Sequence, residues 1–124
     1  MIYVIDDDRE FAECIAKMIK AFGEKEVKIF GNGIEATEAI NEELPKMIFL
    51  DILLDGPDGF TFLNELMSYS DTEKIPIVIM SSLRLQDQCL KSYGVVKVLD
   101  KAEMVPADIE KLMEKYGGQK NKRF

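Results

Sequence analysis

The sequence predicts a single α/β domain, a doubly wound parallel sheet of five strands with five helices. Three observations support this prediction. The chain has 124 residues, which is the size of one domain. Short apolar runs alternate along it with longer amphipathic stretches, as strands and helices do in α/β proteins. Glycine and proline residues fall at the joints between these segments, where such a chain has to turn.

Five short apolar runs are predicted to form the strands. Each run is apolar on both faces, which is typical of buried parallel strands, so we expect all five to be buried. The runs are residues 2–5, 27–30, 47–50, 77–80 and 95–99.

Five helices are predicted to alternate with these strands. The first contains a stripe of apolar residues that recurs at a period of about 3.6 residues. The stripe consists of Phe11, Ile15, Met18, Ile19 and Phe22. The other helices are expected near residues 36–44, 60–67, 85–93 and 105–116.

The composition argues against several classes of function. No apolar run approaches the roughly 18 residues of a membrane span, and residues 1–8 lack the features of a signal peptide. We therefore expect a cytoplasmic protein without membrane contact.

The chain has no histidine, and its two cysteines, Cys14 and Cys89, lie far apart. A zinc site, a disulfide scaffold and a histidine-based triad are therefore excluded or strongly disfavoured. Both cysteines are interpreted as residues of a helix core or boundary. The net charge of -7 opposes direct binding to nucleic acid.

Charged and hydroxyl side chains directly follow four of the predicted strands. In an open parallel sheet the carboxyl ends of the strands meet at one edge, where function gathers. Carboxylates that converge there repel one another, and a divalent cation such as Mg²⁺ relieves the repulsion. A carboxylate between Mg²⁺ and an ammonium group can attack phosphorus and become an acyl phosphate. The side chains are Asp6, Asp7 and Asp8 after the first strand, Asp51 after the third, Ser81 after the fourth and Lys101 after the fifth.

Each of these residues also has a structural interpretation when it is taken alone. The acidic residues 6–8 could cap the first helix, and Asp51 could begin a turn. Ser81 could belong to a loop, and a single lysine such as Lys101 is commonly a solvated surface charge. Their shared position at one sheet edge favours a functional site.

The order and spacing of these residues resemble the receiver domain of bacterial two-component response regulators. Asp7 and Asp51 are 44 residues apart, and Asp51 and Ser81 are 30 residues apart, as that family has them. Gly59 follows Asp51 by eight residues, and Lys101 follows the fifth strand. The similarity covers residues 1–117. Residues 118–124 are interpreted as a polar, basic tail or the start of a linker.

The resemblance implies a flavodoxin-like fold with strand order 2-1-3-4-5 and specific roles at the sheet edge. It also implies that Asp8 caps a helix, and that Asp7 is favoured over Asp6 as the direct metal ligand. The implied roles are Asp51 as phosphoacceptor, Asp6, Asp7, Asp51 and the Leu53 carbonyl as Mg²⁺ ligands, Ser81 as the switch hydroxyl and Lys101 as the lysine that neutralises phosphoryl charge.

The resemblance also implies partners. The phosphoryl donor would be a histidine kinase or a histidine phosphotransfer protein, and residues 84–116 would form a surface for a partner or a homodimer. The output target is not indicated. We expect slow self-dephosphorylation, because Leu53 and Leu83 stand near the phosphoryl group and their apolar side chains cannot orient an attacking water.

Three departures from the family pattern keep alternatives open. Val98 stands where the family has an aromatic residue, Ala102 where it has proline, and Asp55 where it has another proline. These changes favour a degenerate receiver that binds a partner without phosphorylation, whereas the intact acidic and lysine positions oppose it. An ordinary trans peptide is expected after Lys101, since proline is absent there.

Two further alternatives are weaker. A haloacid-dehalogenase-type phosphohydrolase needs threonine or valine where Glu10 stands. A dinucleotide site would use residues 31–36, which fit Gly-x-Gly-x-x-Ala but follow the second strand rather than the first.

Overall fold

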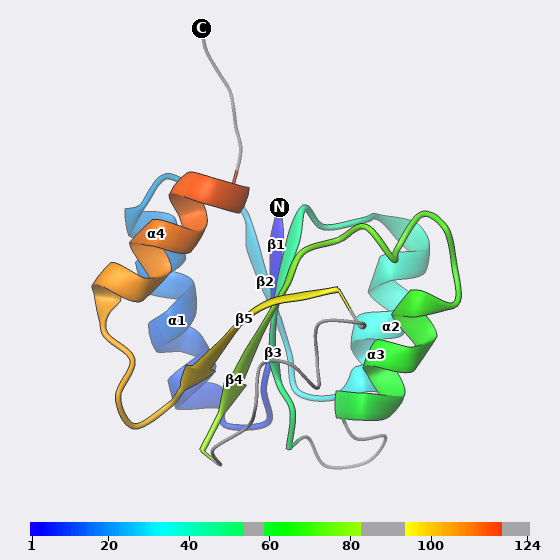
Figure 1. Ribbon diagram of the computed structural model, residues 1–124, viewed down its shortest axis with the longest axis horizontal. Helices are drawn as coiled ribbons and strands as arrows, with labels where there is room; N and C mark the ends of the chain where they lie inside the picture. Colours follow the sequence, from blue (N-terminus) through cyan, green and yellow to red (C-terminus); the bar gives the residue numbers. More distant parts are fainter. Residues whose placement is uncertain (54–58, 83–93, 118–124) are drawn as a thin grey trace, which may run out of the picture.

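The computed structural model describes residues 1–53, 59–82 and 94–117 (Figure 1). A parallel sheet in the order β2-β1-β3-β4-β5 forms the centre of the molecule, which is the predicted strand order. The strands are β1 (Ile2–Ile5), β2 (Val27–Phe30), β3 (Met47–Asp51), β4 (Ile77–Ser81) and β5 (Val95–Asp100). Four helices in the described residues are α1 (Arg9–Ala21), α2 (Gly33–Glu42), α3 (Gly59–Met67) and α4 (Pro106–Tyr116).

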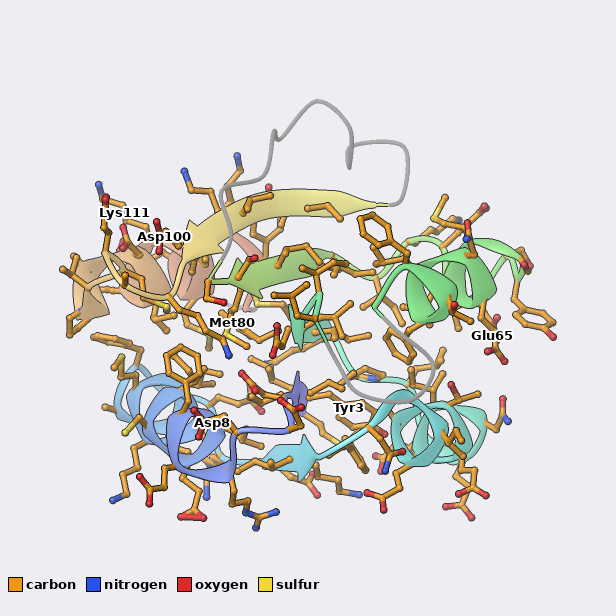
Figure 2. The ribbon with its side chains drawn as sticks, turned by 90° about the horizontal axis from the view of Figure 1, so that it is seen from below. Tyr3, Asp8, Glu65, Met80, Asp100 and Lys111 are labelled. Atoms are coloured by element: carbon orange, nitrogen blue, oxygen red, sulfur yellow. The ribbon has the colours of Figure 1, made fainter. Side chains whose placement is uncertain are left out.

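The helices cover both faces of the sheet, as a doubly wound fold requires. Helices α1 and α4 lie on one face, and α2 and α3 lie on the other (Figures 1 and 2). Three strands extend one residue further than predicted, and the last helix begins at Pro106 with Val105 as its N-cap. The helix expected near residues 85–93 lies outside the described residues.

The core has two layers because neighbouring residues of a strand point to opposite faces of the sheet. Tyr3 and Leu50 belong to the layer beneath α2 and α3, where Phe62 packs. Val4 and Phe49 belong to the layer beneath α1 and α4. The central strands are therefore apolar at every position before the sheet edge.

The prediction that all five strands are buried was wrong for the two edge strands. The strands β1, β3 and β4 are buried throughout, but β2 is only partly buried and β5 has exposed positions. Lys28, Val96 and Lys97 are exposed. An edge strand has one neighbour instead of two, and its polar side chains reach water at little cost.

Side chains cap the first two helices. The cap at Asp8 confirms the prediction for α1, whereas α2 begins at Gly33, three residues before its predicted start, because Asn32 caps it. The carboxylate of Asp8 accepts a hydrogen bond from the backbone N–H of Phe11 at 3.1 Å at the start of α1. The side chain of Asn32 accepts one from the N–H of Glu35 at 2.9 Å at the start of α2. The prediction for Cys14 was wrong, because this residue lies on the exposed face of α1, and Cys89 lies outside the described residues.

Gly59 holds the start of α3 against the end of β3. Its N–H donates a hydrogen bond to the carbonyl oxygen of Ile52 at 3.2 Å. A Cβ atom at Gly59 would lie 2.7 Å from the Cα of Ile52, so a larger residue would push the helix away. None of the described helices is long and apolar enough to cross a membrane.

Candidate functional site

The strands β1, β3, β4 and β5 end at one edge of the sheet, and this edge holds the predicted site residues. Ile5 pairs with Leu50 in the sheet register, so the next residues, Asp6 and Asp51, are neighbours. Asp51 pairs in turn with Met80, and Ser81 is the last residue of β4. The structure thus brings together residues that are far apart in the sequence.

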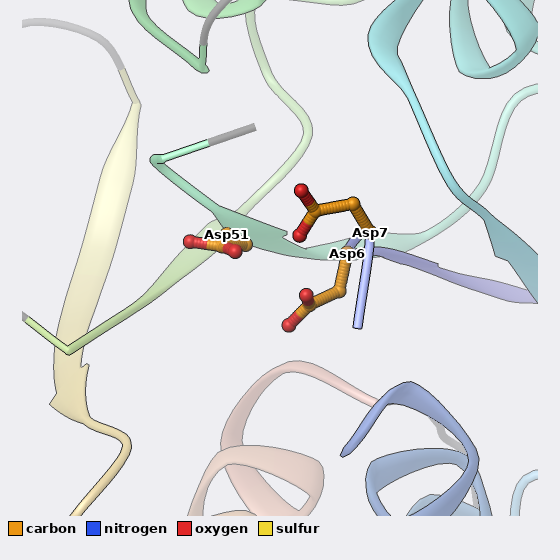
Figure 3. A group of neighbouring side chains, drawn as sticks. All are labelled: Asp6, Asp7 and Asp51. Carbon is orange, nitrogen blue, oxygen red and sulfur yellow. The ribbon is translucent and has the colours of Figure 1, made fainter. Parts of the chain in front are cut away.

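Three carboxylates converge at this edge. One oxygen atom each of Asp6, Asp7 and Asp51 lies within 4.8 Å of the others (Figure 3). Asp6 and Asp51 are 1% and 5% exposed, while Asp7 is exposed. Two buried acids and one exposed acid therefore surround a position that solvent can reach from the side of Asp7.

Lys101 supplies an ammonium group to this cluster. Its Nζ lies 2.8 Å from Oδ2 of Asp6 and 3.3 Å from Oδ2 of Asp51. Its backbone N–H donates to the carbonyl oxygen of Ser81 at 2.8 Å, which fixes the chain just after β5. The ammonium also lies 4.5 Å from the centre of the Phe11 ring, a distance typical of a cation–π contact.

The pKa values of Asp6 and Lys101 reflect burial and mutual attraction. Burial raises the pKa of Asp6, and the charge of Asp51 adds to this, while the hydrogen bonds from Lys101 and from the N–H of Asp8 only partly offset it. Burial alone would lower the pKa of Lys101, but the hydrogen bond to Asp6 and the charges of Asp6 and Asp51 raise it above its usual value. Lys101 is therefore positively charged at neutral pH, and one ammonium faces three acidic groups.

The donor set at this edge fits a hard divalent cation. Oδ2 of Asp6 is buried, and the ammonium of Lys101 lies 2.8 Å from it. Carboxylate oxygens are the ligands that Mg²⁺ prefers, and a divalent charge would balance the excess of acids. Asp8 does not belong to this set, because its carboxylate caps α1.

The remaining predicted residues are placed as follows. Ser81 is fully buried at the end of β4. The backbone N–H of Leu53 donates to Oδ1 of Asp51 at 3.0 Å, and the Leu53 side chain is 46% exposed. Val98 is half-buried on β5, and the peptide bond between Lys101 and Ala102 is trans, as expected. Asp55 and Leu83 lie outside the described residues.

Phe11 is a site residue that the sequence reasoning missed. The apolar stripe assigned it to the helix core, and it does pack against the core layer beneath α1 and α4. It is also the residue of the stripe nearest the start of α1, and a helix that follows a parallel strand begins at the carboxyl edge of the sheet. That position was the available signal that Phe11 faces the site.

Comparisons with known proteins agree with this fold and site. The chain matches the model of the response regulator receiver domain over residues 2–116, and it belongs to that family. It is therefore a receiver domain of two-component signalling.

Two relatives show how this domain occurs in longer proteins. The chain is 34% identical over 94 residues to protein-glutamate methylesterase/protein-glutamine glutaminase 1 of Syntrophomonas wolfei, which is 73% of this chain and 26% of that protein. It is 29% identical over 114 residues to the transcriptional regulatory protein ZraR of Klebsiella oxytoca. This match covers 90% of this chain and 24% of that protein. The chain thus spans about a quarter of the length of these relatives.

A solved structure supports the fold. The receiver domain of the sensor histidine kinase PA1611 from Pseudomonas aeruginosa superposes with a TM-score of 0.80 at 21% sequence identity, covering 94% of this chain and 97% of that chain. That structure has a magnesium ion coordinated in its active site cleft.

Proposed function

We propose that this receiver domain accepts a phosphoryl group on Asp51 from a phosphorylated histidine of a partner protein. The observation that carries the proposal is the position of Asp51: a buried carboxylate at the end of β3, 3.3 Å from the ammonium of Lys101 and beside two further acids. A carboxylate oxygen of Asp51 attacks the phosphorus, the bond from phosphorus to the imidazole nitrogen breaks, and its electron pair leaves with the imidazole.

Asp6, Asp7 and Asp51 would hold a Mg²⁺ ion through carboxylate oxygens, with the carbonyl of Leu53 as a further ligand. The bound ion would neutralise phosphoryl charge during transfer. The magnesium ion of the Pseudomonas aeruginosa receiver supports this assignment. Asp7 is the exposed member of the set, and the other two acids are held by the sheet.

Lys101 keeps its ammonium group beside Asp51 before transfer and faces the phosphoryl oxygens afterwards. Its contacts with Asp6 and Phe11 hold the side chain over the site. Ser81, buried at the end of β4, would donate a hydrogen bond from its hydroxyl to a phosphoryl oxygen and so sense the modified state. Such a switch could not involve the reorientation of an aromatic ring at residue 98, because this residue is Val98.

The acyl phosphate is expected to be long-lived. The side chain of Leu53 is apolar and has no group that could hold a water in line with phosphorus. The decay of the phosphorylated protein measured on Phos-tag gels should therefore be slow, and decay as fast as that of chemotaxis-type regulators would contradict this.

The proposed partners follow from the reaction. A histidine kinase or a histidine phosphotransfer protein would donate the phosphoryl group, and a partner or a second copy would bind within residues 84–116. The functional unit proposed is residues 1–117, and residues 118–124 are a tail or linker that lies outside the described residues. A degenerate receiver is disfavoured because the acids and Lys101 are all in place.

Intact-mass spectrometry after incubation with acetyl phosphate tests the proposal. We expect one phosphoryl adduct that requires Mg²⁺ and is absent from the Asp51→Asn variant. Asp71→Asn, which changes an exposed acid away from the site, is the matched control and should be modified like the wild type. A folded wild-type protein that gains no adduct in the presence of Mg²⁺ would favour the degenerate receiver.

A further inference from the structure

The charges of the chain are distributed unevenly. Residues 29–73 contain ten acidic side chains and one basic side chain, Lys46, a formal charge of -9, whereas the whole chain carries -7. Neither α2 nor α3 contains a lysine or an arginine. Helix α2 carries Glu35, Glu38 and Glu42 and α3 carries Glu65, so the two helices that cover this face of the sheet are acidic.

A groove lies between α2 and α3 on this face. Its volume is about 250 Å³. Ile34, Thr37 and Glu38 line it from α2, and Phe62 and Glu65 line it from α3. Figure 2 labels Glu65 on α3, on the side of the sheet that α2 also covers. Apolar surface at the groove is thus flanked by a carboxylate from each helix.

The same half of the molecule exposes apolar side chains. Ile34 is 58% exposed although it belongs to the first turn of α2. Among the described residues seven large apolar side chains are exposed, and five of them lie between residues 29 and 73. These five are Ile34, Leu44, Leu53, Phe60 and Tyr69.

We propose that the groove between α2 and α3 binds a basic amphipathic helix of a partner protein. Apolar side chains of that helix would pack on Ile34, which is exposed at the groove. Its lysine or arginine side chains would pair with Glu38 and Glu65. A groove between two helices accepts the apolar face of a third helix in this way. A second copy of this chain is disfavoured as the occupant through the same face, because two strongly acidic surfaces repel.

This docking surface does not depend on the phosphorylation proposed above. Glu38 and Glu65 lie outside the acidic cluster at the sheet edge, and binding requires neither Mg²⁺ nor modified Asp51. The Asp51→Asn protein should therefore bind the basic helix as the wild type does. A wild-type protein that binds the basic helix but gains no phosphoryl adduct would count against the proposed function alone.

An NMR titration of the ¹⁵N-labelled full chain with two synthetic peptides tests the docking surface. Both peptides carry leucines on one helical face, and the other face carries lysines in one peptide and glutamates in the other. The basic peptide should shift the amides of residues 33–38 and 61–66, and it should bind at least about tenfold tighter than the acidic peptide. Raising the salt concentration should weaken its binding.

Matched variants separate the apolar contribution from the charged one. Ile34→Ala should weaken binding of the basic peptide about fivefold. The double variant Glu38→Gln/Glu65→Gln should weaken it by a similar factor, about fivefold, and reduce its salt dependence. Val105→Ala, at the start of α4, and Glu110→Gln/Glu114→Gln, on the same helix, change exposed residues on the opposite face and should leave binding unchanged.

Several results would overturn the proposal. These are equal binding of the two peptides, shifts confined to α1 and α4, unchanged affinity in the groove variants, and no binding of the basic peptide up to about 1 mM. Shifts at the groove that grow with protein concentration in the absence of peptide would show that a second copy is the occupant instead.

Discussion

Two buried carboxylates at opposite edges of the sheet show how this protein separates structural charge from functional charge. Glu24 lies at the edge where the strands begin, 2.9 Å from the amino-terminal ammonium and 2.6 Å from Nζ of Lys46. Asp6 lies at the edge where the strands end. It shares the single ammonium of Lys101 with Asp51 and has Asp7 beside it.

The pKa values of the two acids move in opposite directions. Burial would raise the pKa of Glu24, but the hydrogen bonds and charges of Lys46 and the amino terminus outweigh it and lower the pKa. Burial raises the pKa of Asp6, and one shared ammonium does not reverse this. A buried acid whose charge is balanced stabilises the fold, whereas an excess of acids at one place favours the binding of a cation.

The largest effect on stability is expected from Glu24→Gln. The substitution keeps the shape of the side chain but leaves two ammonium groups without their buried counter-charge, which should cost about 2 kcal/mol of unfolding free energy. Urea denaturation at neutral pH measures it. The matched control is Glu43→Gln, whose exposed pair with Lys28 is 3.9 Å long and should matter by less than about 0.5 kcal/mol. Equal effects of the two substitutions would contradict the structural role of Glu24.

The cost of Glu24→Gln should depend on pH with a defined sign. The pKa of Glu24 is lower in the folded protein than its usual value of 4.5. The ionised side chain therefore stabilises the fold fully above pH 4.5 and loses this effect as the pH falls through the folded-state pKa. The difference in unfolding free energy between wild type and variant should shrink in acid. If this difference in unfolding free energy grew in acid, the proposed sign of the pKa shift of Glu24 would be wrong.

A smaller effect of opposite sign is expected at the other edge. Asp6→Asn removes one of three crowded carboxylates, so the metal-free variant should be more stable than the wild type by about 1 kcal/mol. Urea denaturation in the presence of a chelator measures the difference, with Asp71→Asn as the control for an exposed acid. Destabilisation of the variant by more than the control would show that the ion pair between Asp6 and Lys101 dominates instead.

The smallest effect concerns Phe11. Phe11→Leu keeps an apolar side chain in the core but removes the ring beneath the ammonium of Lys101, a contact of about 0.5–1 kcal/mol. The rate of phosphorylation by acetyl phosphate should fall about threefold, while the stability change stays that of an ordinary core substitution. Phe22→Leu, further along the same stripe, is the control and should leave the rate unchanged. An equal loss of rate in both variants would assign Phe11 a packing role only.

Much of this arrangement could be predicted from the sequence because it follows from periodicity and local chemistry. The apolar runs predicted the five strands, and Asp8 was predicted at a helix start, because a cap acts within three residues of its position. The convergence of Asp6, Asp7 and Asp51 followed from parallel strands that end at one edge.

The features that the sequence could not predict depend on tertiary context. Lys28, Val96 and Lys97 are exposed because β2 and β5 lie at the edges of the sheet. The expectation that these strands are buried came from the apolar character of each run taken alone, which does not show how many neighbours a strand has. Cysteine is often a core residue, but Cys14 lies on the exposed face of α1. The pair between Lys101 and Phe11 joins residues that are ninety positions apart in the sequence.

The measurement that tests the central claim most directly is a calorimetric titration of Mg²⁺ into three proteins at neutral pH: wild type, Asp6→Asn and Glu24→Gln. If the excess of acids at the carboxyl edge holds the cation, the wild type and Glu24→Gln should bind Mg²⁺ alike, and Asp6→Asn should bind it at least about tenfold more weakly. Equal affinity in all three proteins, or no binding by the wild type, would contradict the account.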